Sequence, residues 1–232
     1  MAKCYSVIVA GGSGMRFGSA LPKQFVLLAG EPVLMHTLER FADYYASHAD
    51  VEGEIILVLP QAHMATWHEL CVKHSFAVKH RVVAGGDTRF QSVLNALNSL
   101  PADDVDAVVA IHDGVRPLVT KALIEQAFTV AQSTGSAIPV TPVIDSIRKV
   151  DADGSSQAMN RSELRAVQTP QAFRLAELRQ AYAVPFDESF TDDASVYEHM
   201  GHKVTLIDGC RQNIKITNSG DIAIAEILLE QN

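Results

Sequence analysis

The chain has 232 residues, and 19 Lys and Arg against 27 Asp and Glu give it a formal net charge of −8. With 47% hydrophobic and 20% charged residues, its composition is that of a globular protein and excludes a disordered chain. Without a block of basic residues an acidic chain is not expected to bind nucleic acid, because counterion release needs clustered Lys and Arg. A few well-placed cations can still hold a small anionic substrate.

Membrane and export signals are not found in the sequence. No segment approaches the ~18 consecutive apolar residues that a membrane span requires, and the first residues contain no secretory signal. The three cysteines, Cys4, Cys71 and Cys210, are widely spaced and odd in number, which favours reduced thiols over a disulfide framework. We therefore expect a cytoplasmic protein with no membrane anchor.

Along the first two thirds of the chain, short apolar segments alternate with longer amphipathic ones. The apolar segments predict strands at Tyr5–Val9, Glu54–Leu59, Val78–Val83, Ala107–Ile111 and Ser136–Val140. The amphipathic segments predict helices at Val33–His48, Ala62–His74, Arg89–Leu100 and Lys121–Thr134, and Pro32 and Thr120 are start signals. Strands that are apolar on both faces indicate a mostly parallel sheet with helices on both sides, which is a Rossmann-like, doubly wound α/β fold.

The alternation ends after Val140. Two segments, Asp145–Val150 and Ala158–Val167, flank a polar turn and predict a protruding β-arm over about 143–168. After the arm we expect helices at Arg174–Tyr182 and Asp192–His199, a strand at Lys203–Ile207 and a closing helix at Asp221–Leu229. Thr191, Asp192 and Asp193 are typical of a helix N-cap. No repeat or linker divides the chain, so residues 1–232 are predicted to form one domain that carries the arm.

In open parallel sheets, ligands bind outside the carboxyl ends of the strands, and a glycine-rich loop follows the first predicted strand. Its glycines, which let the backbone approach an anion, are Gly11, Gly12 and Gly14. The loop is not a Walker motif, and Phe17 stands where the dinucleotide fingerprint has its third glycine. Arg16 and Lys23 add the cations that phosphoryl or nucleotidyl transfer needs. The structural alternative is a surface turn with two solvated cations.

Two more strand ends have chemically suggestive residues. Gly85, Gly86 and Asp87 follow the third strand and lead to Arg89 and Ser92, which suits contacts to a base or ribose or else a plain tight turn.

His112 and Asp113 end the fourth strand, where Asp113 stands as an Mg²⁺ ligand would and Arg116 lies beside an anion site. Asp113 could instead cap the following turn. Thr169, in a turn after the arm, and Lys215, in an expected late strand at Asn213–Thr217, are compatible with binding or structural roles.

Together these motifs resemble the 2-C-methyl-D-erythritol 4-phosphate cytidylyltransferase family, nearly end to end. The matching motifs are Ala10–Gly14 with Arg16, Pro22–Gln24, Gly85–Asp87 with Arg89 and Ser92, His112–Asp113 with Arg116–Pro117, Pro142–Val143 with Asp145–Ser146, Arg161 with Gln168–Gln171, Thr191–Asp192, and Asn213–Lys215.

The resemblance implies a nucleotidyltransferase fold and transfer of CMP from CTP to 2-C-methyl-D-erythritol 4-phosphate, in isoprenoid precursor biosynthesis. It implies that Arg16 and Lys23 are catalytic. The implied nucleotide contacts are Ala10, Gly11, Gly12, Gly14, Gly85, Gly86, Asp87 and Ser92, with backbone groups contacting the cytosine. The implied sugar-phosphate contacts are Asp113, Arg116, Thr169, Thr191 and Lys215. It also implies Mg²⁺ held mainly by the triphosphate near Asp113, and a homodimer in which Ser146 and Arg161 of the arm complete the partner's site.

Three other functions stay open at this point, of which a Rossmann oxidoreductase is disfavoured by the missing third glycine. The family commonly has an Ala-Ala pair where this chain has Ala10-Gly11-Gly12, and the Ala-Gly-Gly loop also occurs in ribitol-5-phosphate cytidylyltransferases. Ser146 stands where Thr is usual, a change that keeps the hydroxyl. The arm, with Arg148 after Asp145-Ser146, favours the methylerythritol branch. A non-catalytic nucleotide-binding protein is a further alternative, which both cations and Asp113 disfavour.

Overall fold

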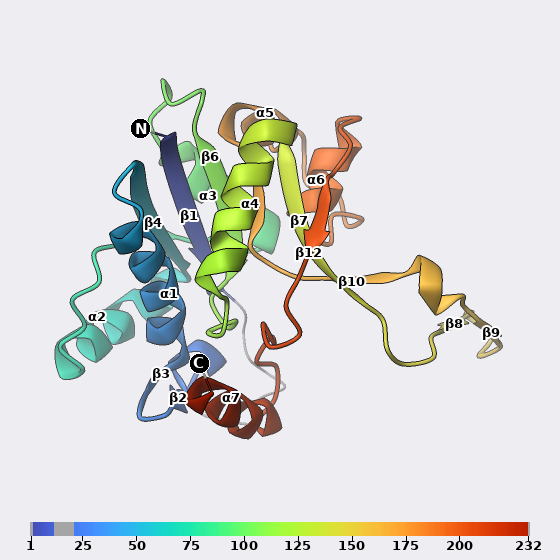
Figure 1. Cartoon of the computed structure of the whole chain (residues 1–232), viewed down its shortest axis with the longest axis horizontal. Coiled ribbons are helices and arrows are strands. Elements are labelled where there is room, and N and C mark those ends of the chain that lie inside the picture. The colour runs from blue at the N-terminus through green and yellow to red at the C-terminus, as the bar shows by residue number, and fades with distance from the viewer. Residues whose placement is uncertain (1, 12–20, 232) are drawn as a thin grey trace.

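Residues 2–11 and 21–231 are described by a computed structural model, in which an eight-stranded mixed sheet runs through the molecule (Figure 1). The strand order is β10-β7-β11-β6-β1-β4-β5, and β12 also pairs with β7. The strand bounds are β1 Ala2–Val9, β4 Val51–Leu59, β5 Arg81–Ala84, β6 Val108–Asp113, β7 Ser136–Pro142, β10 Arg165–Val167, β11 Gln171–Arg174 and β12 Leu206–Asp208. Strands β1, β4, β5 and β6 are mutually parallel, whereas β11 runs antiparallel to both β6 and β7.

Helices cover both faces of the sheet, which confirms the doubly wound α/β prediction. Successive side chains of a strand point to opposite faces, so Tyr5 and Val7 of β1 join one core cluster and Cys4 and Ile8 join the other. The first cluster includes residues of α3 (Arg89–Asn98), α5 (Leu175–Ala181) and α6 (Asp193–His199). The second includes residues of α1 (Val33–Ser47), α2 (Met64–Lys73) and α4 (Lys121–Thr134). Within the described part of the chain, no helix has the length and apolar character of a membrane span.

Helix starts follow the expected capping chemistry. Pro32 precedes α1, and the Thr120 hydroxyl accepts a hydrogen bond (3.2 Å) from the Leu123 N–H at the start of α4. A third, smaller core joins the hairpin of β2 (Leu27–Leu28) and β3 (Glu31–Pro32) to α7 (Gly220–Glu230) (Figure 1).

The arm projects from the sheet as a two-stranded hairpin of β8 (Arg148–Val150) and β9 (Ser156–Ala158) (Figure 1). The predicted arm segment Ala158–Val167 is not one continuous strand. The Asn160 side chain accepts a hydrogen bond from the Ser162 N–H (3.2 Å) and starts the 3₁₀ turn η3 (Arg161–Glu163), after which β10 joins the main sheet. The arm therefore consists of a free hairpin and a base that is anchored in the sheet.

Other predicted elements differ in their bounds from the structure. Strand β5 begins at Arg81 rather than Val78, and β12 covers Leu206–Asp208 rather than Lys203–Ile207. Residues 171–174 form β11, so the helix begins only at Leu175.

Asn213–Thr217, expected as a strand, is irregular, because its backbone bonds to loops instead. The Ile216 N–H donates to the Val115 carbonyl (2.9 Å), and the Asn213 carbonyl accepts from Arg116 (2.9 Å).

Candidate active site

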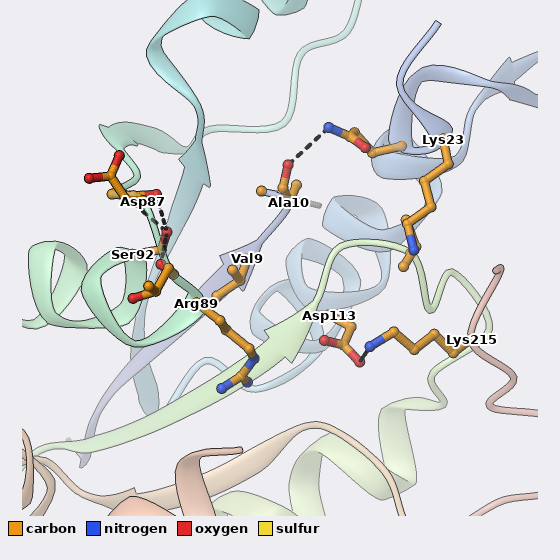
Figure 2. A pocket seen from close by; sticks show the side chains of 13 residues that line it. Val9, Ala10, Lys23, Asp87, Arg89, Ser92, Asp113 and Lys215 are labelled. Carbon is orange, nitrogen blue, oxygen red and sulfur yellow. Dashed lines mark hydrogen bonds and ion pairs between the residues drawn. The ribbon is translucent and has the colours of Figure 1, made fainter. Parts of the chain in front are cut away.

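The carboxyl ends of β1 and β6 and the loop after β5 enclose a cleft of about 220 Å³ (Figure 2). Its lining residues are Val9, Ala10, Gly11, Lys23, Gln24, Gly86, Asp87, Thr88, Arg89, Ser92, Asp113, Val115 and Lys215. The cleft therefore unites three of the strand ends that the sequence analysis singled out. Gly12, Gly14 and Arg16 lie outside the described residues.

The loop after β5 is fixed to the first turn of α3. Ser92 Oγ accepts a hydrogen bond from the Gly86 N–H (3.1 Å) and donates one to the Thr88 carbonyl (2.9 Å). The Thr88 hydroxyl caps the helix by accepting from the Gln91 N–H (3.0 Å). Gly86 has no space for a side chain, because a Cβ there would lie 2.1 Å from Gln91 Cγ.

Gly85, expected to contact a nucleotide, does not line the cleft. Its N–H donates to the Leu59 carbonyl (2.8 Å), and a Cβ at this position would lie 3.0 Å from Ser92 Oγ. The absence of a side chain at Gly85 thus gives Ser92 room to hold the loop.

Lys23 enters the cleft from the short 3₁₀ helix η1 (Lys23–Phe25). The buried neighbour Gln24 donates a hydrogen bond from Nε2 to the Ala10 carbonyl (2.9 Å), which fixes η1 to the end of β1. Figure 2 shows Lys23 on the same side of the cleft as Lys215, opposite Asp87 and Ser92.

A second cleft of about 160 Å³ adjoins the first, and Arg89, Asp113 and Lys215 line both. The other residues that line it are Arg116, Val167, Gln168, Thr169, Gln171, Thr191 and Asp192. The structure thus brings together Asp113, Arg116, Thr169, Thr191 and Lys215, which the sequence analysis took from four separate segments. It also adds Gln171 and Asp192 to the lining.

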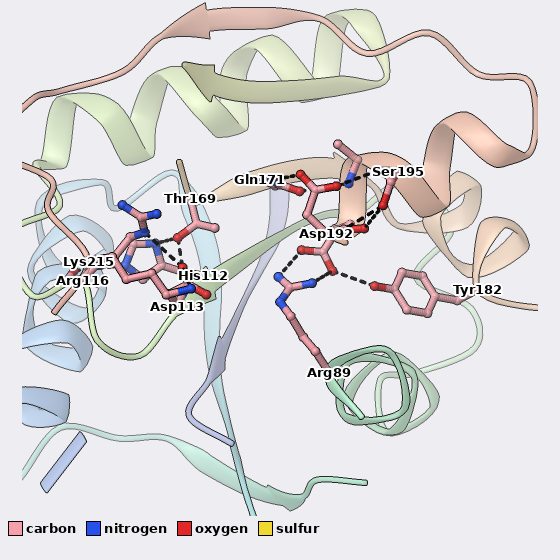
Figure 3. A network of polar contacts seen from close by, with 12 residues as sticks. Arg89, His112, Asp113, Arg116, Thr169, Gln171, Tyr182, Asp192, Ser195 and Lys215 are labelled. Carbon is pink, nitrogen blue, oxygen red and sulfur yellow. Dashed lines mark hydrogen bonds and ion pairs between the residues drawn. The ribbon is translucent and has the colours of Figure 1, made fainter. Parts of the chain in front are cut away.

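Asp113 is held between two cations at the boundary of the clefts. Its Oδ2 accepts from Arg116 Nε at 3.0 Å and lies 3.1 Å from Lys215 Nζ (Figure 3). Burial alone would raise the pKa of Asp113, but Lys215, Arg116 and Arg89 outweigh it and hold that pKa well below its usual range. One carboxylate with two cations leaves a net positive charge, which suits a phosphate group. The carboxylate pairs with these cations rather than capping the following turn.

His112 is a site residue to which the sequence analysis gave no role. It is completely buried, and burial lowers its pKa to about 4, so the ring is neutral at pH 7. Its Nε2 lies 3.2 Å from the Arg116 carbonyl, which can only accept, so Nε2 carries the proton. Nδ1 then accepts from the Thr169 hydroxyl (3.1 Å), whose oxygen accepts from the Asp113 N–H (3.1 Å). In the sequence, His112 was marked only by its position next to Asp113 and by its place in the His112–Asp113 motif of the resemblance.

Arg89 was noticed in the sequence without an assigned role. Its guanidinium donates two hydrogen bonds, at 2.9 and 2.5 Å, to the carboxylate of Asp193, which is completely buried. The Tyr182 hydroxyl donates to Oδ1 of the same carboxylate at 2.6 Å (Figure 3). No local pattern indicated this pairing.

The start of α6 has the predicted cap. Asp192 accepts from the Ser195 N–H (2.9 Å), and Ser195 Oγ accepts from the Asp192 N–H (3.1 Å), which completes a capping box (Figure 3). Gln171 Nε2 donates to the other oxygen of Asp192 (2.9 Å). Thr191 is therefore presented to the second cleft from a rigid helix start.

Ser146 and Arg161 line neither cleft. Both lie on the arm, where the Arg161 guanidinium donates a hydrogen bond to the Ile144 carbonyl. Within one chain, the structure does not bring these two residues to the site.

Comparisons with known proteins agree along the whole chain. A family model described as 2-C-methyl-D-erythritol 4-phosphate cytidylyltransferase matches residues 4–231. Proteins of that name from Porphyromonas gingivalis and Bacteroides thetaiotaomicron are 52% and 47% identical over 228 and 223 residues, covering 98% and 96% of this chain and 98% of each relative.

Solved structures show the same arrangement. A 4-diphosphocytidyl-2C-methyl-D-erythritol synthase from Anaerococcus prevotii superposes with a TM-score of 0.80 at 28% identity, covering 99% of both chains. A 2-C-methyl-D-erythritol 4-phosphate cytidylyltransferase from Thermus thermophilus gives 0.74 at 28% identity, covering 97% of this chain and 98% of that one.

Proposed function

The chain belongs to the 2-C-methyl-D-erythritol 4-phosphate cytidylyltransferase family, and we propose that its two adjoining clefts carry out that reaction. The enzyme transfers CMP from CTP to 2-C-methyl-D-erythritol 4-phosphate and releases pyrophosphate. One observation supports this assignment most strongly: the two clefts meet at Asp113, Lys215 and Arg89. Two phosphorylated substrates, one in each cleft, would meet at this positively charged boundary.

CTP occupies the first cleft in this proposal. The fixed loop at Gly86 and Asp87 contacts the nucleoside, with Ser92 holding the loop in place. Ala10 and Gly11 line the cleft, and we assign them to triphosphate binding together with Gly12 and Gly14, which follow in the sequence. Gly85 does not contact the nucleotide in this arrangement; its lack of a side chain leaves room for Ser92, which holds the loop.

The sugar phosphate occupies the second cleft, where Arg116 and Lys215 attract its phosphate and Thr191 lies within the same lining. A phosphate oxygen of the sugar attacks the α-phosphorus of CTP, and the bond to the leaving pyrophosphate breaks. Lys23, with Arg16, stabilises the negative charge that develops on the α-phosphate. Asp113 orients the Lys215 ammonium, and the hydroxyl of Thr169 is held by His112.

A divalent cation, Mg²⁺, is part of the proposal. Asp87 and Asp113 are the carboxylates lining the first cleft, and Oδ1 of Asp113 has no hydrogen-bond or ion-pair partner among the described residues. Mg²⁺ is commonly held by one or two carboxylates together with substrate phosphates, so this donor set fits it. When bound, the cation neutralises the triphosphate and the leaving pyrophosphate.

The arm is proposed to form a homodimer in which Ser146 and Arg161 complete the partner's second cleft. Five large apolar side chains of the arm and its base are exposed in the single chain: Ile144, Ile147, Val150, Met159 and Val167. Burying such side chains against a second copy stabilises association.

Pyrophosphate release from CTP and Mg²⁺ tests the function, with 2-C-methyl-D-erythritol 4-phosphate and ribitol 5-phosphate as parallel acceptors. We expect release with the methylerythritol substrate alone. Release with ribitol phosphate alone would retain cytidylyl transfer but replace the substrate. Release with neither acceptor, from a folded protein that binds CTP, would contradict the proposed reaction.

A further inference from the structure

We propose that Arg89 is a positioning residue that couples the two clefts, so that CTP in the first raises the affinity of the second for the sugar phosphate. The inference rests on the proposed function. Arg89 is the first residue of α3, and Asp193 is the first residue of α6. Their bidentate ion pair joins the two helix starts although 104 residues separate them in the chain.

On the nucleotide side, Arg89 cannot move independently of the loop it follows. Thr88 caps α3, and Ser92 in the first turn binds both the Gly86 N–H and the Thr88 carbonyl. A ligand that binds Gly86 and Asp87 therefore also restrains the backbone that carries Arg89.

On the sugar-phosphate side, Asp193 directly follows Thr191 and Asp192, which line the second cleft. Gln171 Nε2 holds the Asp192 carboxylate, and its Oε1 accepts from the Ala194 N–H (3.0 Å). The Asp193 carboxylate is completely buried, and among the described residues Arg89 is the only cation that forms an ion pair with it. The position of this helix start thus depends on that of Arg89.

The ion pair of Arg89 with Asp193 is the polar link between α3 and α6. Among the hydrogen bonds of the described residues, only the two from Arg89 to Asp193 connect α3 with α6. Separating a buried carboxylate from its cation is strongly unfavourable, so the helix starts move together. The stacking of Phe90 on Tyr182, with ring centroids 4.6 Å apart, keeps Tyr182 beside the pair.

Isothermal titration calorimetry measures the coupling directly. The affinity for 2-C-methyl-D-erythritol 4-phosphate is determined with Mg²⁺, with and without a saturating α,β-methylene analogue of CTP that cannot transfer CMP. We expect the analogue to tighten sugar-phosphate binding in the wild-type enzyme by roughly 5-fold or more. In Arg89→Lys, which keeps the charge but loses the bidentate geometry, the ratio of the two affinities should approach one.

Arg81→Lys is the matched control. Arg81 also pairs with a carboxylate, Glu54 (2.8 Å), and its side chain is 37% exposed against 32% for Arg89, but it lines neither cleft. This variant should keep the wild-type ratio. A merely structural loss in Arg89→Lys would weaken both affinities and leave their ratio unchanged, and that result would overturn the proposal.

Tyr182→Phe keeps the test decisive if Arg89→Lys does not fold. It retains the ion pair and removes only the hydrogen bond to Asp193, so we expect a partial loss of coupling. Coupling that is absent from the wild type, or fully retained in Tyr182→Phe and in any folded Arg89→Lys, would refute the role of Arg89. Failure of the wild type to bind either ligand would instead refute the proposed function.

Discussion

The Lys215 ammonium lies 3.1 Å from Oδ2 of Asp113. Lys215 belongs to the irregular segment before α7, whereas Asp113 is the last residue of strand β6. The contact joins the last segment of the chain to the middle of the sheet. It also holds a cation where the two clefts meet, so the phosphate groups of both proposed substrates would approach the same positive charge.

Lys23→Ala should lower turnover by roughly 10²–10³-fold, because it removes a preorganised positive charge that stabilises the negative charge developing on the α-phosphate. Steady-state pyrophosphate release measures the effect. Lys121→Ala is the control, since Lys121 lies at the start of α4, 3.9 Å from Asp43, and lines neither cleft. Near-normal turnover of folded Lys23→Ala would remove this residue from the mechanism.

Ser92→Ala should raise KM for CTP several-fold with a smaller effect on kcat. The variant leaves the Gly86 N–H without its 3.1 Å acceptor, and losing one such hydrogen bond costs about 1 kcal/mol. Ser99→Ala, at the other end of α3, removes a similar bond (2.7 Å) to the Ala96 carbonyl outside the cleft. If both variants change KM for CTP equally, the loop is not the nucleotide contact.

His112 should make the enzyme less stable in acid. Its pKa of about 4 in the folded protein lies below the ordinary value of 6.5. The unfolded chain therefore binds more protons between these values, and the free energy of unfolding falls as the pH drops from 6.5 to 4. The full effect of about 2.5 pKa units is about 3.5 kcal/mol at ~1.4 kcal/mol per unit, and about 3 kcal/mol of it is lost by pH 4, where the folded protein is half protonated.

Urea unfolding of wild type and His112→Gln at pH 7 and pH 4 tests this dependence. Other titrating groups are common to both proteins, so the wild type should lose about 3 kcal/mol more than the variant. Equal losses in the two proteins would mean that His112 does not titrate in this range.

Val150→Asp should dissociate the proposed dimer, because it places a charge on the exposed apolar surface of the arm. Light scattering coupled to size-exclusion chromatography gives the mass. Val72→Asp is matched in exposure, at 68% against 66% for Val150, but lies on α2 and should leave the mass unchanged. A monomeric wild type would contradict the dimer.

Mixed dimers test whether the arm completes the partner's site. Lys23→Ala and Arg161→Ala chains should each have little activity alone, whereas a mixed dimer contains one site with both residues intact. Activity should therefore reappear after subunit exchange. If exchange is demonstrated and activity stays absent, Arg161 does not act across the dimer.

The sequence by itself determined much of the framework. Apolar runs and helical periodicity located β1, α1 and α4, because each of these elements buries a face whose pattern is local. Glycines and charges after the strands indicated the site, since parallel strands bring their carboxyl ends to one edge of a sheet.

Only the tertiary structure decided the rest. Strand β11 has four residues and exists because β6 and β7 offer it backbone partners on both sides. The segment at Asn213–Thr217 is irregular because loops satisfy its backbone groups. The Arg89–Asp193 pair joins residues 104 positions apart, and no local pattern records such a contact. Hydrogen bonds and ion pairs between distant segments form only between surfaces that the folded chain brings together, so they cannot be read from the local sequence.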